Sequence, residues 1–182
     1  FNFSRRTAFA CLLGSLFLFS HSQTAMNSLP LKVNEQEYFE SPGINVLVFS
    51  NWYNASFSDS KMSGIEIIHH EVRTVTNGDV RISPTPGQWD PIPEFVERKI
   101  DKEKNIIEAF LKYPEFNFKY SIKAEALNNG LRLTVNLQQP LPEKLRGKAG
   151  FNLEFLPSAY FEKAYLMDDR PGVFPLYPGG PM

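Results

Sequence analysis

The stretch 116–137, FNFKYSIKAEALNNGLRLTVNL, alternates apolar and polar side chains over two arms, 116–124 and 131–137. A period of two places one face of a strand in a core and the other face in water. Between the arms, the Asn-Asn-Gly of 128–130 consists of residue types that tolerate the positive φ of a primed hairpin turn. The stretch therefore predicts a long β-hairpin, in which Gly130→Val would be destabilising because a β-branched residue resists positive φ.

Short strands are predicted along most of the remaining chain. Phenylalanine and tyrosine are abundant, and all 14 prolines lie after position 29, often in pairs that separate short strands. Asn77 and Gly78 predict a second hairpin turn. The predicted strands fall at 44–49, 64–70, 72–76, 79–83, 94–99 and 150–156, besides the long hairpin. Seven or eight such strands predict an all-β fold, an antiparallel β-sandwich.

The stretch 101–112, DKEKNIIEAFLK, fits either a helix or a strand. Its apolar residues have helical spacing, and Asp101 could cap a helix N-terminus. However, the long hairpin follows at once, and a hairpin of two strands is unstable without a further strand. We therefore favour a strand that pairs with the hairpin.

The first residues have the pattern of a signal peptide. Arg5 and Arg6 precede an apolar run at 7–19 that is shorter than a membrane span, and small residues follow. We expect cleavage after Ser22, with cleavage after Ala25 as the alternative. The mature protein would then be exported, to the periplasm or out of a bacterial cell, and would not remain in the membrane. Its only cysteine, Cys11, would be removed, which excludes disulfides and thiol chemistry.

Charge and motif content exclude several function classes. The net charge of −1 gives no electrostatic basis for binding nucleic acid. No nucleophile motif or phosphate-binding glycine loop occurs, and no cofactor is predicted. His69 and His70 are neighbours that would point to opposite faces of a strand, so no metal site is predicted.

Three other features could contact a substrate. Asp168 and Asp169 could be the paired carboxylates of a glycosidase, although with Arg170 they equally suggest a salt-bridged turn. Trp52 and Trp89 lie in predicted loops, where their flat faces could stack on sugar rings. We therefore name Trp52 and Trp89 as candidate substrate-binding residues and name no catalytic residue.

The runs NGDVRISPTPGQWDPIP at 77–93 and GKAGFNLEFLPSAYFEKAYLMDDRPGVFPLYPGGPM at 147–182 resemble the N-terminal β-sandwich region of secreted bacterial six-hairpin glycosidases, close to the family 9 glycoside hydrolases. In such enzymes the sandwich precedes an (α/α)6 barrel that carries the catalytic acid and base. The resemblance implies that the catalytic carboxylates lie beyond residue 182 and that this segment is itself inactive.

These observations predict four regions. They are a signal peptide (1–22), a mobile N-terminal segment (23–36), the sandwich domain (37–170) and a Pro/Gly-rich connector (171–182) to a missing C-terminal domain. The expected function is that of a non-catalytic domain of a polysaccharide-degrading glycoside hydrolase, with its catalytic domain, and polysaccharide, as partners. A stand-alone carbohydrate-binding module or surface-glycan-binding protein is the first alternative, and a structural envelope protein is the second.

The signal-peptide interpretation can be tested on protein from the native host. N-terminal sequencing should find Gln23 as the first residue, or Met26 if the alternative site is used. Mature protein that retains residues 1–19 would contradict the interpretation.

Overall fold

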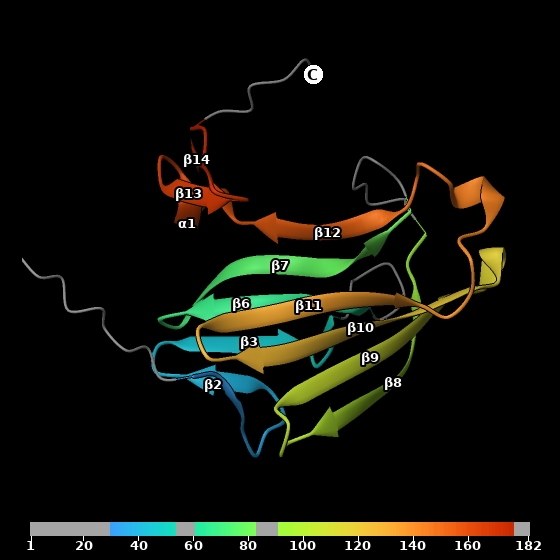
Figure 1. Ribbon diagram of the computed structural model, residues 1–182, viewed down its shortest axis with the longest axis horizontal. Coiled ribbons are helices and arrows are strands. Elements are labelled where there is room, and N and C mark those ends of the chain that lie inside the picture. Colours follow the sequence, from blue (N-terminus) through green and yellow to red (C-terminus); the bar gives the residue numbers. More distant parts are fainter. Residues whose placement is uncertain (1–29, 54–60, 83–90, 177–182) are drawn as a thin grey trace, which may run out of the picture.

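The computed structural model describes residues 30–53, 61–82 and 91–176, and it confirms an all-β fold of antiparallel sheets (Figure 1). One sheet has six strands in the order β1-β2-β3-β6-β7-β12, and the other has four in the order β11-β10-β9-β8. The six-stranded sheet contains β1 (Lys32–Val33), β2 (Phe39–Ser41), β3 (Ile44–Val48), β6 (Ile65–His69), β7 (Val72–Arg81) and β12 (Gly150–Phe155). The four-stranded sheet contains β8 (Glu94–Asp101), β9 (Ile106–Tyr113), β10 (Phe118–Leu127) and β11 (Gly130–Leu137).

Two small hairpins and three short helices complete the described elements. The hairpins are β4 (Trp52–Tyr53) with β5 (Lys61–Met62), and β13 (Ala164–Met167) with β14 (Arg170–Val173). The helices are η1 (Pro114–Phe116), η2 (Glu143–Leu145) and α1 (Pro157–Tyr160). The described strands exceed the predicted seven or eight, because strands of two or three residues leave no period in the sequence.

The core lies between the two sheets and follows the alternation of the sequence. Every second residue of β9 is buried, and the core-facing residues of β10 are fully buried from Phe118 to Ala124. Across the interface, Val46 and Val48 of β3 and Ile65 of β6 join the same cluster. The apolar face of the long hairpin therefore packs on the six-stranded sheet.

The stretch 101–112 contains no helix. β8 ends at Asp101, and β9 pairs with β10 through Ile107 opposite Ala124 and Leu111 opposite Tyr120, as the favoured strand prediction required. Asp101 forms a turn instead of a helix cap, because its Oδ1 accepts a hydrogen bond from the Lys104 backbone N–H at 2.9 Å. That hydrogen bond lowers the pKa of the Asp101 carboxyl below its usual value.

The turn of the long hairpin lies where it was predicted, with Leu127 paired to Gly130. The predicted backbone conformation is wrong, because none of Asn128, Asn129 and Gly130 has a positive φ. A Cβ added at Gly130 would meet nothing within 4 Å, so the expected penalty for Gly130→Val loses its basis.

The second predicted hairpin turn, at Asn77 and Gly78, is not found at that position. Asn77 and Gly78 lie inside β7, where Asn77 has a φ of 52° and the pairing with β6 shifts register. The β6–β7 turn consists of His70 and Glu71, whose φ values are 47° and 67°. Two positive φ values define a primed turn, here built from residues that seldom adopt it.

Two of the predicted region boundaries also need correction. Lys32 and Val33 form β1 and therefore belong to the sandwich, not to a mobile N-terminal segment. Residues 171–173 lie in β14, so the C-terminal hairpin extends into the predicted connector. The predicted signal peptide lies outside the described residues. No helix within 30–53, 61–82 and 91–176 has the length and apolar character needed to cross a membrane.

The strained turn predicts opposite effects of glycine at two sites. Glu71→Gly should raise the free energy of unfolding by about 0.5–1 kcal/mol, because glycine adopts positive φ without steric cost. Asn129→Gly, at a turn position without positive φ, should lower it by about 0.5–1 kcal/mol through lost chain entropy. Urea unfolding followed by circular dichroism measures both, and two changes of the same sign would contradict the turn assignment.

Candidate functional site

Trp52, a predicted sugar-contacting residue, lies on β4 with 59% of its surface exposed. Its ring meets Phe95 of β8 edge-on, with the ring centroids 6.5 Å apart. The structure thus places an exposed aromatic side chain beside the four-stranded sheet, where a sugar ring could contact it. Trp89, the other predicted residue, lies outside the described residues, so nothing is shown of its distance from Trp52.

A buried carboxylate holds the base of the hairpin that carries Trp52. Glu66 of β6 is 0% exposed, and its Oε2 accepts hydrogen bonds from Asn51 Nδ2 at 2.6 Å and from Ser63 Oγ at 3.1 Å. Its Oε1 lies 2.8 Å from Nε of Arg73 on β7. Asn51 and Ser63 flank β4 and β5, and the Ser63 N–H donates to the Asn51 carbonyl oxygen. Glu66 therefore ties the β4–β5 hairpin to the six-stranded sheet.

Sequence reasoning did not identify Glu66. Its only signal is that it interrupts the apolar run GIEII at 64–68, where a lone carboxylate must be either exposed or bound by donors. The donors come from positions 15 and 3 residues before it and 7 residues after it. Nothing in the spacing of the sequence points to that combination.

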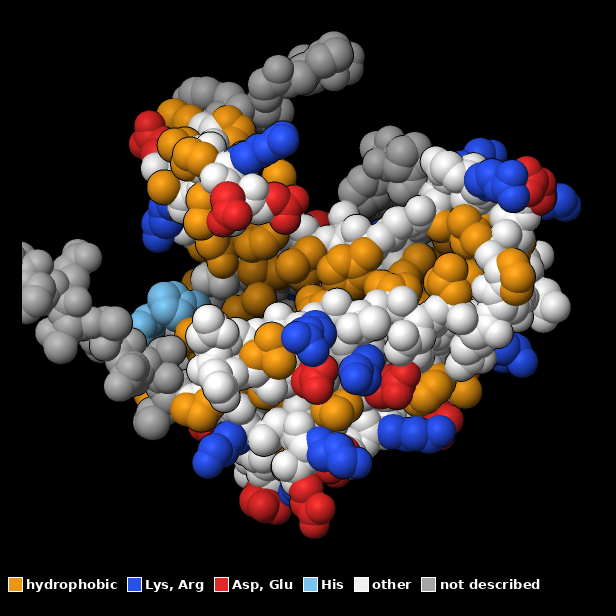
Figure 2. Space-filling model, viewed as in Figure 1, with side chains coloured by type: hydrophobic (Ala, Val, Ile, Leu, Met, Phe, Trp, Pro, Cys, Tyr) orange, Lys and Arg blue, Asp and Glu red, His pale blue; other side chains and the backbone are white. Residues whose placement is uncertain are grey.

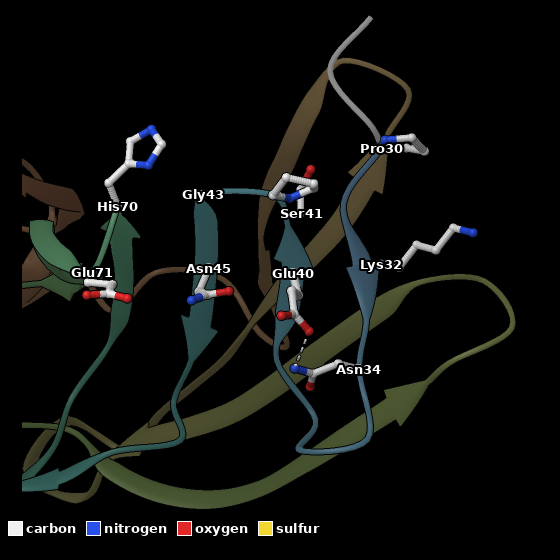
Figure 3. A pocket seen from close by; sticks show the side chains of 10 residues that line it. Pro30, Lys32, Asn34, Glu40, Ser41, Gly43, Asn45, His70 and Glu71 are labelled. Atoms are coloured by element: carbon white, nitrogen blue, oxygen red, sulfur yellow. Dashed lines mark hydrogen bonds between the residues drawn. The ribbon is translucent and has the colours of Figure 1, made fainter.

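An open depression of about 830 Å³ lies at the outer edge of the six-stranded sheet (Figure 3). Lys32, Glu40 and Asn45 form a row across β1, β2 and β3, as the strand register requires. Glu40 Oε2 accepts a hydrogen bond from Asn34 Nδ2 at 3.0 Å. Pro30, Ser41, Pro42, Gly43, His70 and Glu71 complete the lining. The depression offers hydrogen-bonding groups but no large aromatic face.

The two neighbouring histidines are arranged differently from the prediction. Their rings make contact, with centroids 4.4 Å apart, because the left-handed φ of His70 ends the alternation of the strand. The His70 ring lies against Gly43, where an added Cβ would come within 2.7 Å of it. Within the described part of the chain, no group of three or more His, Cys, Asp or Glu side chains is placed to hold a metal ion.

Asp168 and Asp169 form the turn between β13 and β14, with φ values of 48° and 61°. Both residues are exposed, and among the described residues neither makes an ion pair with Arg170. Glycosidase carboxylates face each other across the scissile bond, about 5–9.5 Å apart. Two successive residues at an exposed hairpin tip do not form such a cleft.

The C-terminal elements present an apolar surface to solvent (Figure 2). We call it the C-terminal apolar surface, and its members are Phe161 (43% exposed), Leu166 (69%), Met167 (64%), Val173 (61%) and Leu176 (42%). Beneath it, the Phe174 ring contacts Phe155 of β12 and Tyr160 of α1, with centroid distances of 5.5 and 5.2 Å. This aromatic contact fixes the β13–β14 hairpin on the end of β12.

The role of Glu66 can be tested by comparing two glutamates. Glu66→Ala should lower the free energy of unfolding by about 2–4 kcal/mol, since the buried Ser63 hydroxyl and the partly buried Asn51 amide lose their acceptor and Arg73 loses its ion-pair partner. Glu97→Ala, on exposed β8, should change it by less than about 0.5 kcal/mol. Urea unfolding measures both, and hydrogen exchange should show faster opening of the β4–β5 hairpin only in Glu66→Ala. Equal effects of the two substitutions would contradict the anchoring role.

No protein-family model, curated protein or solved structure matches the chain. A function is therefore inferred from the residues and contacts of the chain itself.

Proposed function

We propose that the chain is the non-catalytic β-sandwich domain of a secreted bacterial glycoside hydrolase that degrades polysaccharide. In this proposal the domain packs against an (α/α)6 barrel, and the barrel supplies the catalytic acid and base. The domain itself hydrolyses nothing, and its function is to hold and stabilise the barrel. Its exported location follows from the predicted signal peptide at 1–22.

The C-terminal apolar surface carries the proposal. Every residue of β13 is exposed, although all four are apolar, and the hairpin partner β14 exposes Val173 as well. A two-stranded hairpin is marginal in water without a packing partner. Contiguous exposed apolar residues on a folded protein indicate an interaction site. A neighbouring protein domain that covers this surface would give the β13–β14 hairpin a packing partner and would remove its apolar side chains from water.

The same residues carry the resemblance to the six-hairpin glycosidases. The run at 147–182 contains β12, α1, β13 and β14, and so contains every member of the C-terminal apolar surface. The resemblance implies a sandwich that precedes a helical barrel. The exposed surface indicates that a partner packs here, and the resemblance favours a helical barrel as that partner over an unrelated protein.

Trp52 favours a second candidate function, carbohydrate binding by the domain itself. It is exposed on an anchored hairpin, and aromatic rings with one free face are suited to stacking on sugars. Titration of the chain with soluble β-glucan oligosaccharides should then show binding that Trp52→Ala removes and Phe161→Ala retains. Absence of binding by the unsubstituted chain would reject this candidate.

The domain proposal predicts opposite effects of one double substitution in two proteins. Residues 23–182 alone should be poorly soluble and inactive on β-glucans, whereas the product of the whole gene should be soluble and active. Leu166→Ser with Met167→Ser should raise the solubility of the short chain but lower the melting temperature of the whole product, because it makes the packed surface polar.

Val96→Ser is the matched control, since Val96 is 53% exposed on β8, outside the C-terminal apolar surface. It should leave both proteins nearly unchanged. Hydrolysis of glycan by residues 23–182 alone would overturn the proposal. A whole product that tolerates the double substitution as well as Val96→Ser would also overturn it.

A further inference from the structure

Strand β11 is an edge of the four-stranded sheet, paired only with β10. Because Leu127 pairs with Gly130 across a two-residue turn, the backbone groups of Gly130, Arg132, Thr134 and Asn136 point toward β10. The backbone N–H and C=O groups of the alternate residues Leu131, Leu133, Val135 and Leu137 point away from β10. No other described strand pairs with this row.

The sheet opposite extends beyond this edge. It has six strands against four, and its edge strand β12 places Phe151 beside the core residue Val80 and therefore on the face directed at the other sheet. Phe151 is nevertheless 41% exposed and Phe155 is 44% exposed. Figure 2 shows hydrophobic side chains along a recessed band between β12 and β11. We call this band the β11–β12 trough, and its exposed apolar members are Phe151 and Phe155 of β12 and Leu137 of β11.

The edge of β11 carries none of the features that normally prevent pairing. Natural edge strands are blocked by proline, by inward-pointing charge or by a bulge. β11, GLRLTVNL, has no proline, and it pairs with β10 without a register shift. Its one charged residue, Arg132, lies on the polar face and contacts Glu125 of β10. Leu131, Leu133 and Val135 pack on the core, and Leu137 is 51% exposed at the end of the trough.

We propose that the β11–β12 trough binds an extended segment of a partner protein, which adds to β11 as an antiparallel fifth strand. The row of unpaired backbone groups requires a polypeptide strand as the ligand, since only another strand presents N–H and C=O groups at the same spacing. The exposed phenylalanines require that every second side chain of that strand be apolar. This partner is independent of the barrel in the proposed function.

A second copy of this chain does not fit the trough through its own β11. Antiparallel pairing of two β11 edges would relate the copies by a two-fold axis normal to the sheet. Each six-stranded sheet lies behind its own four-stranded sheet and projects past β11, so the two projecting edges would occupy the same space (Figure 1). A single added strand meets no such obstacle.

The undescribed stretches of the chain also lack a suitable strand sequence. The stretches 83–90 and 177–182 each contain two prolines, which cannot donate a backbone hydrogen bond. The stretch 54–60, NASFSDS, is largely polar, and the apolar run at 7–19 does not alternate. None of these stretches is a suitable donor for the added strand.

A synthetic peptide with the sequence of β11 itself tests the proposal. Antiparallel pairing with Thr134 opposite Thr134 places Leu131 opposite Leu137 and Leu133 opposite Val135, so apolar residues meet apolar residues. One peptide should bind per chain, and hydrogen exchange of the Leu133 and Val135 amides should slow by about ten-fold or more. The amide of Thr134, which already bonds β10, should be unaffected.

Two peptide variants isolate backbone pairing. N-methylation at the peptide's Leu133 and Val135 positions should abolish binding, because those N–H groups would bond β11. N-methylation at its Arg132 and Thr134 positions should leave binding intact, because those N–H groups point to solvent. Binding that both variants retain, or that neither retains, would overturn the proposed strand addition.

Substitutions in the chain isolate the trough. Phe151→Ser should weaken peptide binding by about ten-fold, while Arg132→Ser, on the opposite face of the edge, should change it less than about two-fold. Circular dichroism checks that both variants are folded. Equal effects, no binding of the unmodified peptide at millimolar concentration, or a dimer that protects β11 amides without peptide would each overturn the proposal.

Discussion

Two tyrosine hydroxyl groups of the four-stranded sheet are hydrogen-bonded to β7 of the six-stranded sheet, and they constrain how the two sheets pack. Tyr113 Oη donates to the Val80 carbonyl oxygen at 2.7 Å, and Tyr120 Oη donates to Asp79 Oδ1 at 2.8 Å. Both rings also stack with Phe118. The same two side chains therefore bury apolar surface in the core and align the four-stranded sheet with the six-stranded sheet. Burial, followed by the charge of Asp79, raises the pKa of the Tyr120 phenol, which keeps it a donor. These two hydrogen bonds therefore fix how the four-stranded sheet lies over β7.

The sequence was sufficient to predict the long strands, in which apolar and polar residues alternate. It was insufficient to predict which residues form the turns and with what backbone conformation. The long hairpin was correct because alternation along both of its arms fixes which face is buried. The strand predicted within 101–112 was correct for another reason, since a hairpin of two strands needs a third strand beside it. Asn77 and Gly78 have ideal turn chemistry, yet they lie in a strand because β7 continues across them to pair with β12. His70 and Glu71 turn instead, since pairing of β6 with β7 leaves them between His69 and Val72. Tertiary pairing overrides local preference at both places.

The candidate sites also differ in how much of each could be predicted from the sequence. The exposure of Trp52 could be anticipated from its polar surroundings, whereas the carboxylate of Glu66 that fixes its hairpin could not, because the donors converge only after folding. The resemblance implied a following domain, and the structure leaves Leu166 and Met167 of β13 exposed. The domain therefore has a buried core between its sheets and two exposed apolar surfaces at its edges, the C-terminal apolar surface and the β11–β12 trough.

The central claim is that another domain covers the C-terminal apolar surface in the native protein. Methionine oxidation by peroxide follows exposure, and mass spectrometry measures it at Met167, which is 64% exposed in the chain by itself. Met62, half-buried on β5, is an internal reference. In protein secreted by the native host, Met167 should oxidise at least about ten-fold more slowly than in residues 23–182 alone, with Met62 unchanged. Equal Met167 rates in the two samples would contradict the claim.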